Sequence, residues 1–237
     1  MSRRDEHRAA LRDLGPEGVR AYLTAGSGLP GPRGNLELMA AFADVAPRDL
    51  VLALADDPDE YLRCCGTEGV GRLLLESGDD ALLDLLHTRA ADLLWRVREA
   101  TAMALQRLGD ADPAALRRVL AAWVTDPHPL VRRAAVAGVC EPRLLHDPAT
   151  ARAALDACAA ATASVEALPG DARRDPDVRT LRQALGYCWS VAVAGDPAAG
   201  LPAFAALAAS ADHDTAWMVR ENLKKTRLRR LLDEEPG

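Results

Sequence analysis

Aromatic residues make up only 4% of this 237-residue chain, although hydrophobic residues make up 49%. Alanine and leucine must therefore supply most of the core, and both residues favour helices. Runs of β-branched residues and the alternating pattern of half-buried strands are also lacking, which argues against a sheet. The composition predicts an all-α protein.

Long hydrophobic runs are missing as well. No stretch approaches the roughly 18 uncharged apolar residues of a membrane span. The amino-terminal sequence MSRRDEHRAALRDL is charged and lacks the apolar run of a signal peptide. We therefore expect a cytoplasmic protein with no membrane partner.

The chain has few cysteines, and their number is odd. No CxxC pair occurs, and two of the five cysteines are adjacent, a spacing that suits neither zinc nor an ordinary structural disulfide. We expect buried thiols in a reducing compartment, and no metal site. The cysteines are Cys64, Cys65, Cys140, Cys158 and Cys188.

Motifs for catalysis are absent. The sequence contains no HExxH, no GxSxG and no GxxxxGK[ST], so the Gly/Pro-rich loop at residues 26–35 is interpreted as a linker and not as a phosphate loop. The five histidines are scattered and none is followed by Glu. The sequence therefore predicts no catalytic residues, no cofactor and no enzymatic activity.

Lysine is almost missing, since Lys224 and Lys225 are the only two among 29 basic residues. We interpret this preference for Arg as the codon usage of a GC-rich bacterial genome. The net charge is −6, and residues 1–110 carry all of it, with 13 Arg against 19 acidic residues. An acidic chain disfavours nucleic acid as a partner, because neutralising phosphates supplies much of that affinity.

One pattern is present five times: a hydrophobic residue followed by Arg at the start of a helix-period stretch, usually just after an Asp-rich turn. The successive gaps are 35, 34, 47 and 41 residues, which is typical of two-helix repeats stacked in a solenoid. The pattern arginines are Arg63, Arg98, Arg132, Arg179 and Arg220.

The segments DPHPLVRRA from Asp126, DLLWRVREA from Asp92 and DPDVR from Asp175 resemble the second helices of HEAT repeats. This resemblance covers about residues 35–233 and implies a right-handed α-α superhelix, a HEAT-like solenoid of about five to six helix pairs. We expect residues 1–34 to form capping helices and a Gly/Pro loop. Residues 35–237 would form the repeat domain, continuous with the cap in one structural domain.

Hydrophobic periodicity and Asp-Pro or Gly-Asp turns predict the helix positions. Asp side chains are expected to cap the helices, and Pro to occupy the first turns. The predicted helices cover residues 4–14, 16–25, 36–46, 49–55, 61–76, 80–90, 93–108, 113–124, 129–139, 150–168, 178–194, 198–211 and 215–232.

Two roles are open for the five pattern arginines. In the favoured one they form a structural ladder, each donating a charge-assisted hydrogen bond to an Asp in the turn of a neighbouring repeat. In the other, some of them line the concave face and bind an acidic ligand. The candidate acceptors are Asp59, Asp92, Asp126, Asp177 and Asp214.

The four tryptophans also allow two interpretations. Trp95, Trp123, Trp189 and Trp217 are expected to pack in the core or between repeats, and Trp189 shares a core register with Leu181 and Leu185. The alternative is a surface that stacks on bases or holds a chromophore, which requires two tryptophans on the concave face.

The last predicted helix is the most basic part of the chain. Arg220, Lys224 and Arg227 are spaced i, i+4, i+7 and are expected to share one face. A solvated end cap is the favoured interpretation, and a binding patch for an anion, a nucleic acid or a protein is the other. The residues predicted to contact a partner are Arg133, Arg182, Tyr187, Arg220, Lys224 and Arg227.

The sequence therefore predicts a non-enzymatic protein-interaction scaffold or adaptor whose concave surface binds another protein. Segments WMVRENLKKTRL and LGYCWSVAV resemble bacterial HEAT-repeat proteins, and this resemblance implies no activity. Among enzymatic HEAT-like families, the His-Glu pairs of the di-iron hydroxylase are missing. A DNA-binding protein or alkylpurine DNA glycosylase and a phycobilin lyase-like protein remain alternatives.

Overall fold

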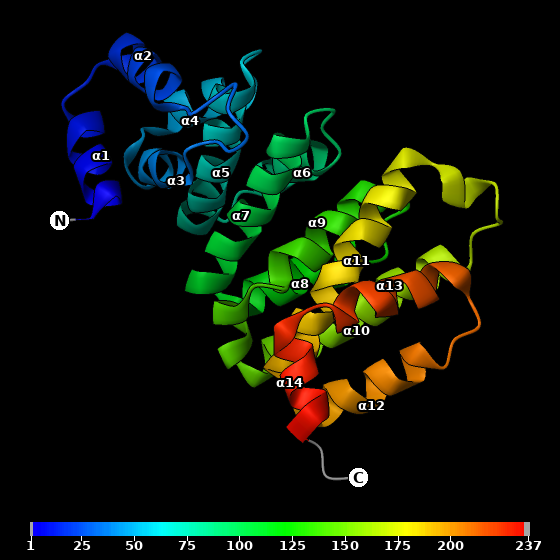
Figure 1. Cartoon of the computed structure of the whole chain (residues 1–237). Helices are drawn as coiled ribbons and strands as arrows, with labels where there is room; N and C mark the ends of the chain where they lie inside the picture. Colours follow the sequence, from blue (N-terminus) through cyan, green and yellow to red (C-terminus); the bar gives the residue numbers. More distant parts are fainter. Residues whose placement is uncertain (1, 235–237) are drawn as a thin grey trace. The chain divides into compact units, whose positions relative to one another are not determined.

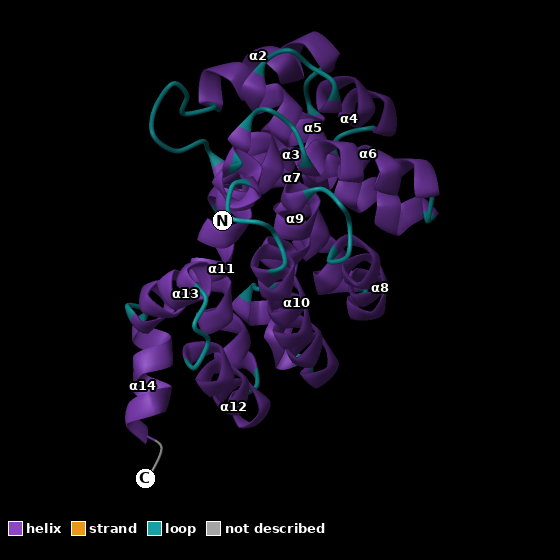
Figure 2. Ribbon diagram, turned by 90° about the vertical axis from the view of Figure 1, so that its right-hand side faces the viewer, coloured by secondary structure: helices purple, strands orange, loops and turns teal. Residues whose placement is uncertain are grey.

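The computed structural model describes residues 2–234, and within this range all regular secondary structure is helical (Figure 2). This confirms the all-α prediction. None of the described helices is both long and apolar enough to cross a bilayer.

The helices follow one another with short connections, and Figure 1 labels them in chain order. Their bounds are α1 Arg3–Arg12, α2 Pro16–Gly26, α3 Leu36–Val45, α4 Arg48–Ala55, α5 Glu60–Ser77, α6 Asp80–Ala90, α7 Trp95–Ala111, α8 Pro113–Trp123, α9 Pro129–Val139, α10 Pro148–Glu166, α11 Pro176–Gly195, α12 Pro197–Ala208, α13 His213–Leu223 and α14 Thr226–Glu234; short 3-10 turns occupy Pro142–His146 and Ala172–Arg174.

The contacts divide the chain into two compact units, residues 1–108 and 109–237. The predicted arrangement, a cap of residues 1–34 continuous with a repeat domain of residues 35–237 in one structural domain, stays a prediction. Within the first unit the two amino-terminal helices pack on the repeat helices, α1 on α3 and α2 on α5.

In the first unit, α4 and α5 lie unusually close. A Cβ atom added to Gly66 of α5 would stand 2.0 Å from the backbone nitrogen of Ala55 at the end of α4. Only glycine allows this approach, and it brings the two backbones into direct contact. Phe42 and Leu54, both fully buried, belong to the core of the same unit.

A network of half-buried and buried charges ties four helices of the first unit together. Asp44 of α3 accepts bonds from Arg4 at 2.7 Å and from Arg107 at 2.7 Å, and Arg107 also donates to Glu68 at 3.0 Å. Burial by itself would raise the pKa of Asp44, but the hydrogen bonds from Arg4 and Arg107 outweigh it and hold the pKa below its usual range. Burial raises the pKa of Glu68, whose Oε2 has no hydrogen-bond partner.

In the second unit, α11 is the central helix and contacts α9, α10, α12, α13 and α14. Trp189 of α11 is buried, and its indole nitrogen donates to the Thr162 hydroxyl of α10 at 3.1 Å. Gly186 lets α13 approach, because a Cβ there would stand 2.9 Å from the ring of Trp217. The core position predicted for Trp189 is therefore confirmed.

Aspartates hold the turn before the second helix of each pair. In each turn the carboxylate accepts the backbone amide two residues further along the chain, which satisfies an otherwise unpaired donor near the helix start. Three of them are the capping residues themselves, as predicted, whereas His128 caps α9. The aspartates and their distances are Asp59 at 2.9 Å, Asp92 at 2.9 Å, Asp126 at 2.7 Å, Asp175 at 2.8 Å and Asp212 at 2.9 Å.

The predicted helix bounds agree with the structure to within three residues, except for the last helix. The sequence predicted one helix over residues 215–232, but the chain breaks between Leu223 and Thr226 to give α13 and α14. The break allows α14 to turn and pack on α11, and Leu228 of α14 is fully buried. Periodicity alone misses it, because both halves have a helical pattern.

Candidate binding sites

The pattern arginines do not share one environment. Arg63 donates to the Asp92 carboxylate of the next repeat at 3.2 Å, which is the pair that the ladder hypothesis requires. It also donates to the Asp57 carbonyl at 2.7 Å. Arg98 donates to the carbonyls of its own turn, at 2.6 Å to Asp92 and 3.2 Å to Leu93.

The three later pattern arginines make no ion pair within the described residues. Arg132 has a buried Nε without a hydrogen-bond partner, and Arg179 and Arg220 are exposed. In the later repeats other arginines pair with the turn aspartates, as Arg173 does with Asp212 at 2.5 Å, and in the first unit Arg20 pairs with Asp57. Turn aspartates are thus paired in several repeats, but by arginines at different positions.

Arg133 is one of the predicted contact residues, and the structure places it inside the fold. It is only 9% exposed and sits on the buried side of α9. A guanidinium in that position presents little surface to a partner. The sequence missed this because two adjacent arginines look equivalent until the helix face is known.

The break between α13 and α14 also separates the basic residues predicted to share one helical face. Arg220 is on α13, Lys224 caps its end, and Arg227 is on α14. Lys224 lies 2.5 Å from Glu221 in an exposed pair. The i, i+4, i+7 spacing therefore no longer describes a common face for these three residues.

Arg227 instead joins Tyr187, which is 42% exposed on α11. Its Nη2 donates to the Tyr187 hydroxyl at 2.9 Å, and its guanidinium carbon lies 5.2 Å from the ring centroid. Lys225 lies over the same ring at 5.4 Å. Two of the six predicted contact residues thus meet in one exposed cation–π cluster.

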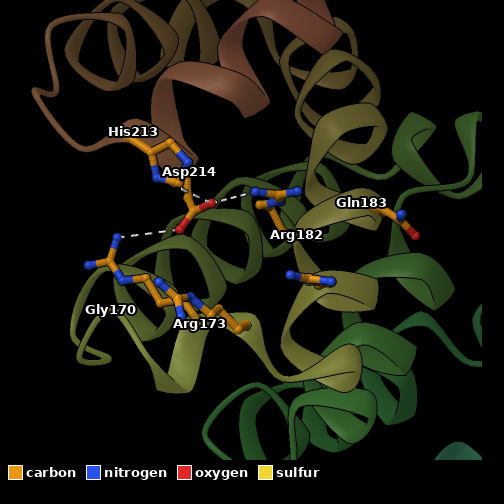
Figure 3. Close-up of a pocket in the computed structure, with 8 residues that line it drawn as sticks. Gly170, Arg173, Arg182, Gln183, His213 and Asp214 are labelled. Carbon is orange, nitrogen blue, oxygen red and sulfur yellow. Dashed lines mark hydrogen bonds and ion pairs between the residues drawn. The ribbon is translucent and has the colours of Figure 1, made fainter.

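Arg182 lines a pocket in the second unit, near the start of α11 (Figure 3). The pocket has a volume of about 750 Å³ and collects four arginines from one stretch of chain. We call it the arginine pocket. Its lining residues are Gly170, Arg173, Arg174, Arg179, Arg182, Gln183, His213 and Asp214.

Asp214 anchors two of these arginines from the first turn of α13. Its buried carboxylate lies 2.5 Å from Arg182 and 3.4 Å from Arg173, and Figure 3 shows both bonds. Arg182 also stacks over the Trp217 ring at 4.6 Å. Both guanidinium groups are therefore held in fixed positions at the wall of the pocket.

Arg173 pairs with Asp212 as well, at 2.5 Å. Burial by itself would raise the pKa of Asp212, but the hydrogen bond from Arg173 and those from the Thr215 and Asp214 amides outweigh it and lower the pKa. Asp212 thus stays ionised while it caps α13 and holds Arg173.

The first unit has a pocket of the opposite character, with a volume of about 370 Å³ and mostly apolar walls. We call it the Trp95 pocket. Trp95 at its edge is 51% exposed and Leu36 is 57% exposed. Its lining residues are Pro32, Arg33, Gly34, Leu36, Met39, Tyr61, Cys64, Trp95, Arg96, Glu99 and Met103.

The thiol of Cys64 in this pocket is protonated at neutral pH. Burial, more than any nearby charge, raises the pKa of Cys64 to about 12. Cys64 contributes apolar surface instead. Within the described residues, His, Cys, Asp and Glu side chains form no group able to hold a metal ion.

The tryptophans divide between core and surface. Trp123 and Trp189 are buried, as predicted, while the core position predicted for Trp95 is wrong. Trp95 begins α7 and is 51% exposed, and it lines the pocket together with Arg33 and Gly34 of the Gly/Pro loop. The guanidinium carbon of its neighbour Arg96 lies 4.6 Å from its ring.

Sequence reasoning found neither pocket as such. The arginine pocket forms at the longest internal break, PGDARRDP, where adjacent Arg173 and Arg174 were a readable signal. The Trp95 pocket joins the Gly/Pro loop to α3, α5 and α7. Its members are far apart in the chain, and no spacing rule connects them.

Comparisons with known proteins agree with this architecture. Residues 37–140 match the family model of HEAT repeats. The fold and this match show that the chain is a HEAT-like repeat protein. No curated protein matches the chain.

Solved structures give distant similarities. An engineered protein is 15% identical over 98% of each chain, with a TM-score of 0.38. A designed armadillo repeat protein in complex with the peptide (KR)4 is 16% identical, over 96% of this chain and 100% of that chain, with a TM-score of 0.40.

Proposed function

We propose that this protein is a non-enzymatic interaction scaffold or adaptor that binds another protein through the surface of its HEAT-like repeats. The observation that carries the proposal is the Trp95 pocket. It is an open apolar cavity with a half-exposed tryptophan at its edge and two arginines in its wall. Tryptophan and arginine are among the residues most enriched at the energetic centres of protein interfaces.

The chemistry of the Trp95 pocket indicates what it binds. Its volume of about 370 Å³ accepts one or two apolar side chains, and Met39 and Met103 give it adaptable walls. Leu36 in the wall of the pocket is 57% exposed and adds to its apolar surface. The proposed partner is an unmodified protein segment that inserts an apolar side chain.

The alternative of a DNA-binding protein or glycosylase receives less support. The net charge is −6, and residues 1–110, which include the Trp95 pocket, contribute 13 − 19 = −6. Phosphate backbones are repelled by such a surface. Trp123 and Trp189 are buried and cannot stack with Trp95 on a base or a chromophore.

The cytoplasm is part of the proposal. All five cysteines lie in described helices or at their ends and none forms a disulfide, which fits a reducing compartment.

Selection from a displayed library of random peptides tests the proposal although the partner is unidentified. We expect enriched peptides that share an apolar residue and lose at least tenfold in affinity on Trp95→Ala. Leu93→Ala is the matched control, because Leu93 is two residues away and more exposed but does not line the pocket. Equal loss in both variants, or no loss in either, would overturn the assignment.

A further inference from the structure

The arginine pocket carries more positive charge than its own carboxylates neutralise. Four of its eight lining residues are arginines. Arg173 and Arg182 are paired with Asp212 and Asp214, whereas Arg174 and Arg179 are exposed and make no ion pair within the described residues. Four positive charges less two negative ones leave an excess of about two at the pocket wall.

From this arrangement we infer that the arginine pocket binds the phosphate monoester of a phosphorylated protein segment. A phosphorylated Ser, Thr or Tyr carries about −1.5 to −2 charges at pH 7, which matches the excess of the pocket. Guanidinium groups bind phosphate oxygens through two parallel hydrogen bonds, so an arginine cluster is the usual protein solution for this ligand. A carboxylate side chain would neutralise only half of the excess.

The pocket is organised before any ligand arrives. Arg173 donates to the Leu168 carbonyl at 2.8 Å and to the Asp212 carboxylate at 2.5 Å, and it also donates to the Glu166 carbonyl and the Asp214 carboxylate, so its guanidinium is held by four acceptors. Arg182 is held by Asp214 and by the Trp217 ring. Two fixed guanidinium groups reduce the ordering cost of binding, and the two exposed arginines supply the new bonds.

Nearby carboxylates limit the affinity of the arginine pocket for a phosphorylated segment. Asp171, Asp175 and Asp177 belong to the same stretch of chain but do not line the pocket. Asp175 is engaged in capping α11, where it accepts the Asp177 amide at 2.8 Å. These negative charges weaken the long-range attraction of a phosphate to the pocket. The contacts inside the pocket must therefore supply the preference for a phosphorylated over an unphosphorylated segment.

The size and confinement of the pocket favour a phosphorylated protein over nucleic acid. About 750 Å³ holds a phosphate together with neighbouring groups of the segment that carries it. Nucleic acid requires an extended basic track, and residues 111–237 have 16 basic and 16 acidic residues, a net charge of zero. The positive excess is local to one pocket.

This inference is independent of the proposed role of the Trp95 pocket. The two pockets belong to different units and share no residue. Either one can fail its test while the other holds.

Fluorescence anisotropy with the full chain and labelled peptide libraries tests the inference. Each library has a fixed central residue, either phosphoserine, phosphothreonine or phosphotyrosine, and is compared with its unphosphorylated form. We expect at least tenfold tighter binding of one phosphorylated library. Arg174→Ala with Arg179→Ala should remove at least tenfold of that affinity, and Arg179→Lys alone should lose less, because the charge remains.

Arg152→Ala is the matched control, since Arg152 is an exposed arginine of the same unit outside the pocket. Circular dichroism verifies that each variant is folded. Equal binding of phosphorylated and unphosphorylated libraries, or no binding at low salt, would overturn the inference. Tighter binding of single-stranded DNA than of any phosphopeptide, with the same loss in the double variant, would assign the pocket to nucleic acid and also overturn it.

Discussion

The side-chain amide of Asn222 on α13 pairs with backbone groups of α11, where its Oδ1 accepts the Ser190 amide at 2.8 Å. Its Nδ2 donates to the Leu185 carbonyl of α11 at 2.8 Å and to the Met218 carbonyl at 2.8 Å. Asn222 is fully buried. One asparagine therefore joins two helices by satisfying backbone groups that water cannot reach.

Asn222→Ala should lower the free energy of unfolding by about 2–4 kcal/mol, since it removes the buried partner of an amide and a carbonyl of α11. Urea denaturation followed by circular dichroism measures this change. Ser190→Ala is the control, because it removes the hydroxyl that donates to the Tyr187 carbonyl but keeps the backbone amide. The control should change stability by less than about 1 kcal/mol, and equal effects would refute this role of Asn222.

The pattern arginines should differ in their contribution to stability. Arg63→Ala should cost about 1–3 kcal/mol, because Asp92 is buried and receives a charge-assisted bond from Arg63. Arg220→Ala should change stability by less than about 0.5 kcal/mol, because Arg220 is exposed and makes no ion pair within the described residues. Thermal unfolding of both variants measures these changes. Equal losses of stability would support the hypothesis that all pattern arginines form one structural ladder.

Glu68 and Asp44 should make opposite contributions to the pH dependence of stability. The folded state raises the pKa of Glu68 above its ordinary value of 4.5, so its contribution is present below that pH and is lost as pH rises through the folded pKa. The stability of the wild type relative to Glu68→Gln should therefore decrease from acidic to neutral pH.

Asp44 provides the reverse control, since its folded pKa lies below the ordinary 3.8. The advantage of the wild type over Asp44→Asn should be complete above that pH and shrink as pH falls through the folded pKa. A tenfold difference in proton affinity between the folded and unfolded states corresponds to about 1.4 kcal/mol. Urea midpoints measured between about pH 3 and 7 test both signs, and parallel curves for the two variants would contradict these assignments.

The five cysteines should resist alkylation in the native state. All are buried. Burial also raises the pKa of Cys65, and the hydrogen bond with Cys158 raises the pKa of Cys140. Mass spectrometry after iodoacetamide treatment at mildly alkaline pH should show little native modification and modification of all five thiols in denaturant. Rapid native labelling of Cys64 would show that the Trp95 pocket opens further than the structure indicates.

The fold could be predicted from the sequence because several local signals occur together in the repeats. Asp at the turn, Pro in the first turn and the Val-Arg helix start recur together, and the structure confirms the local cause at Asp59 and Asp175, which cap their helices. The break after Leu223 was missed, because it depends on the burial of Leu228 as α14 packs on α11 and not on any helix-breaking residue.

Only some residues of the candidate sites could be predicted from the sequence. Arg182 and Tyr187 were identified, and they lie at the arginine pocket and the cation–π cluster, but Arg133 faces the interior. Which arginine is paired depends on the offset between stacked helices, and that offset is set by contacts such as Gly186 against Trp217. Exposure of Trp95 likewise depends on how the Gly/Pro loop folds, which periodicity does not encode.

The central claim is that the Trp95 pocket binds a protein segment, and the methionine methyl groups report on it directly. Met39 and Met103 line the pocket, whereas Met218 is buried in the second unit. In a carbon-13 methyl-methionine spectrum titrated with a selected peptide, the signals of Met39 and Met103 should shift together and that of Met218 should stay in place. Binding that leaves Met39 and Met103 unmoved, or that shifts Met218 alone, would contradict the claim.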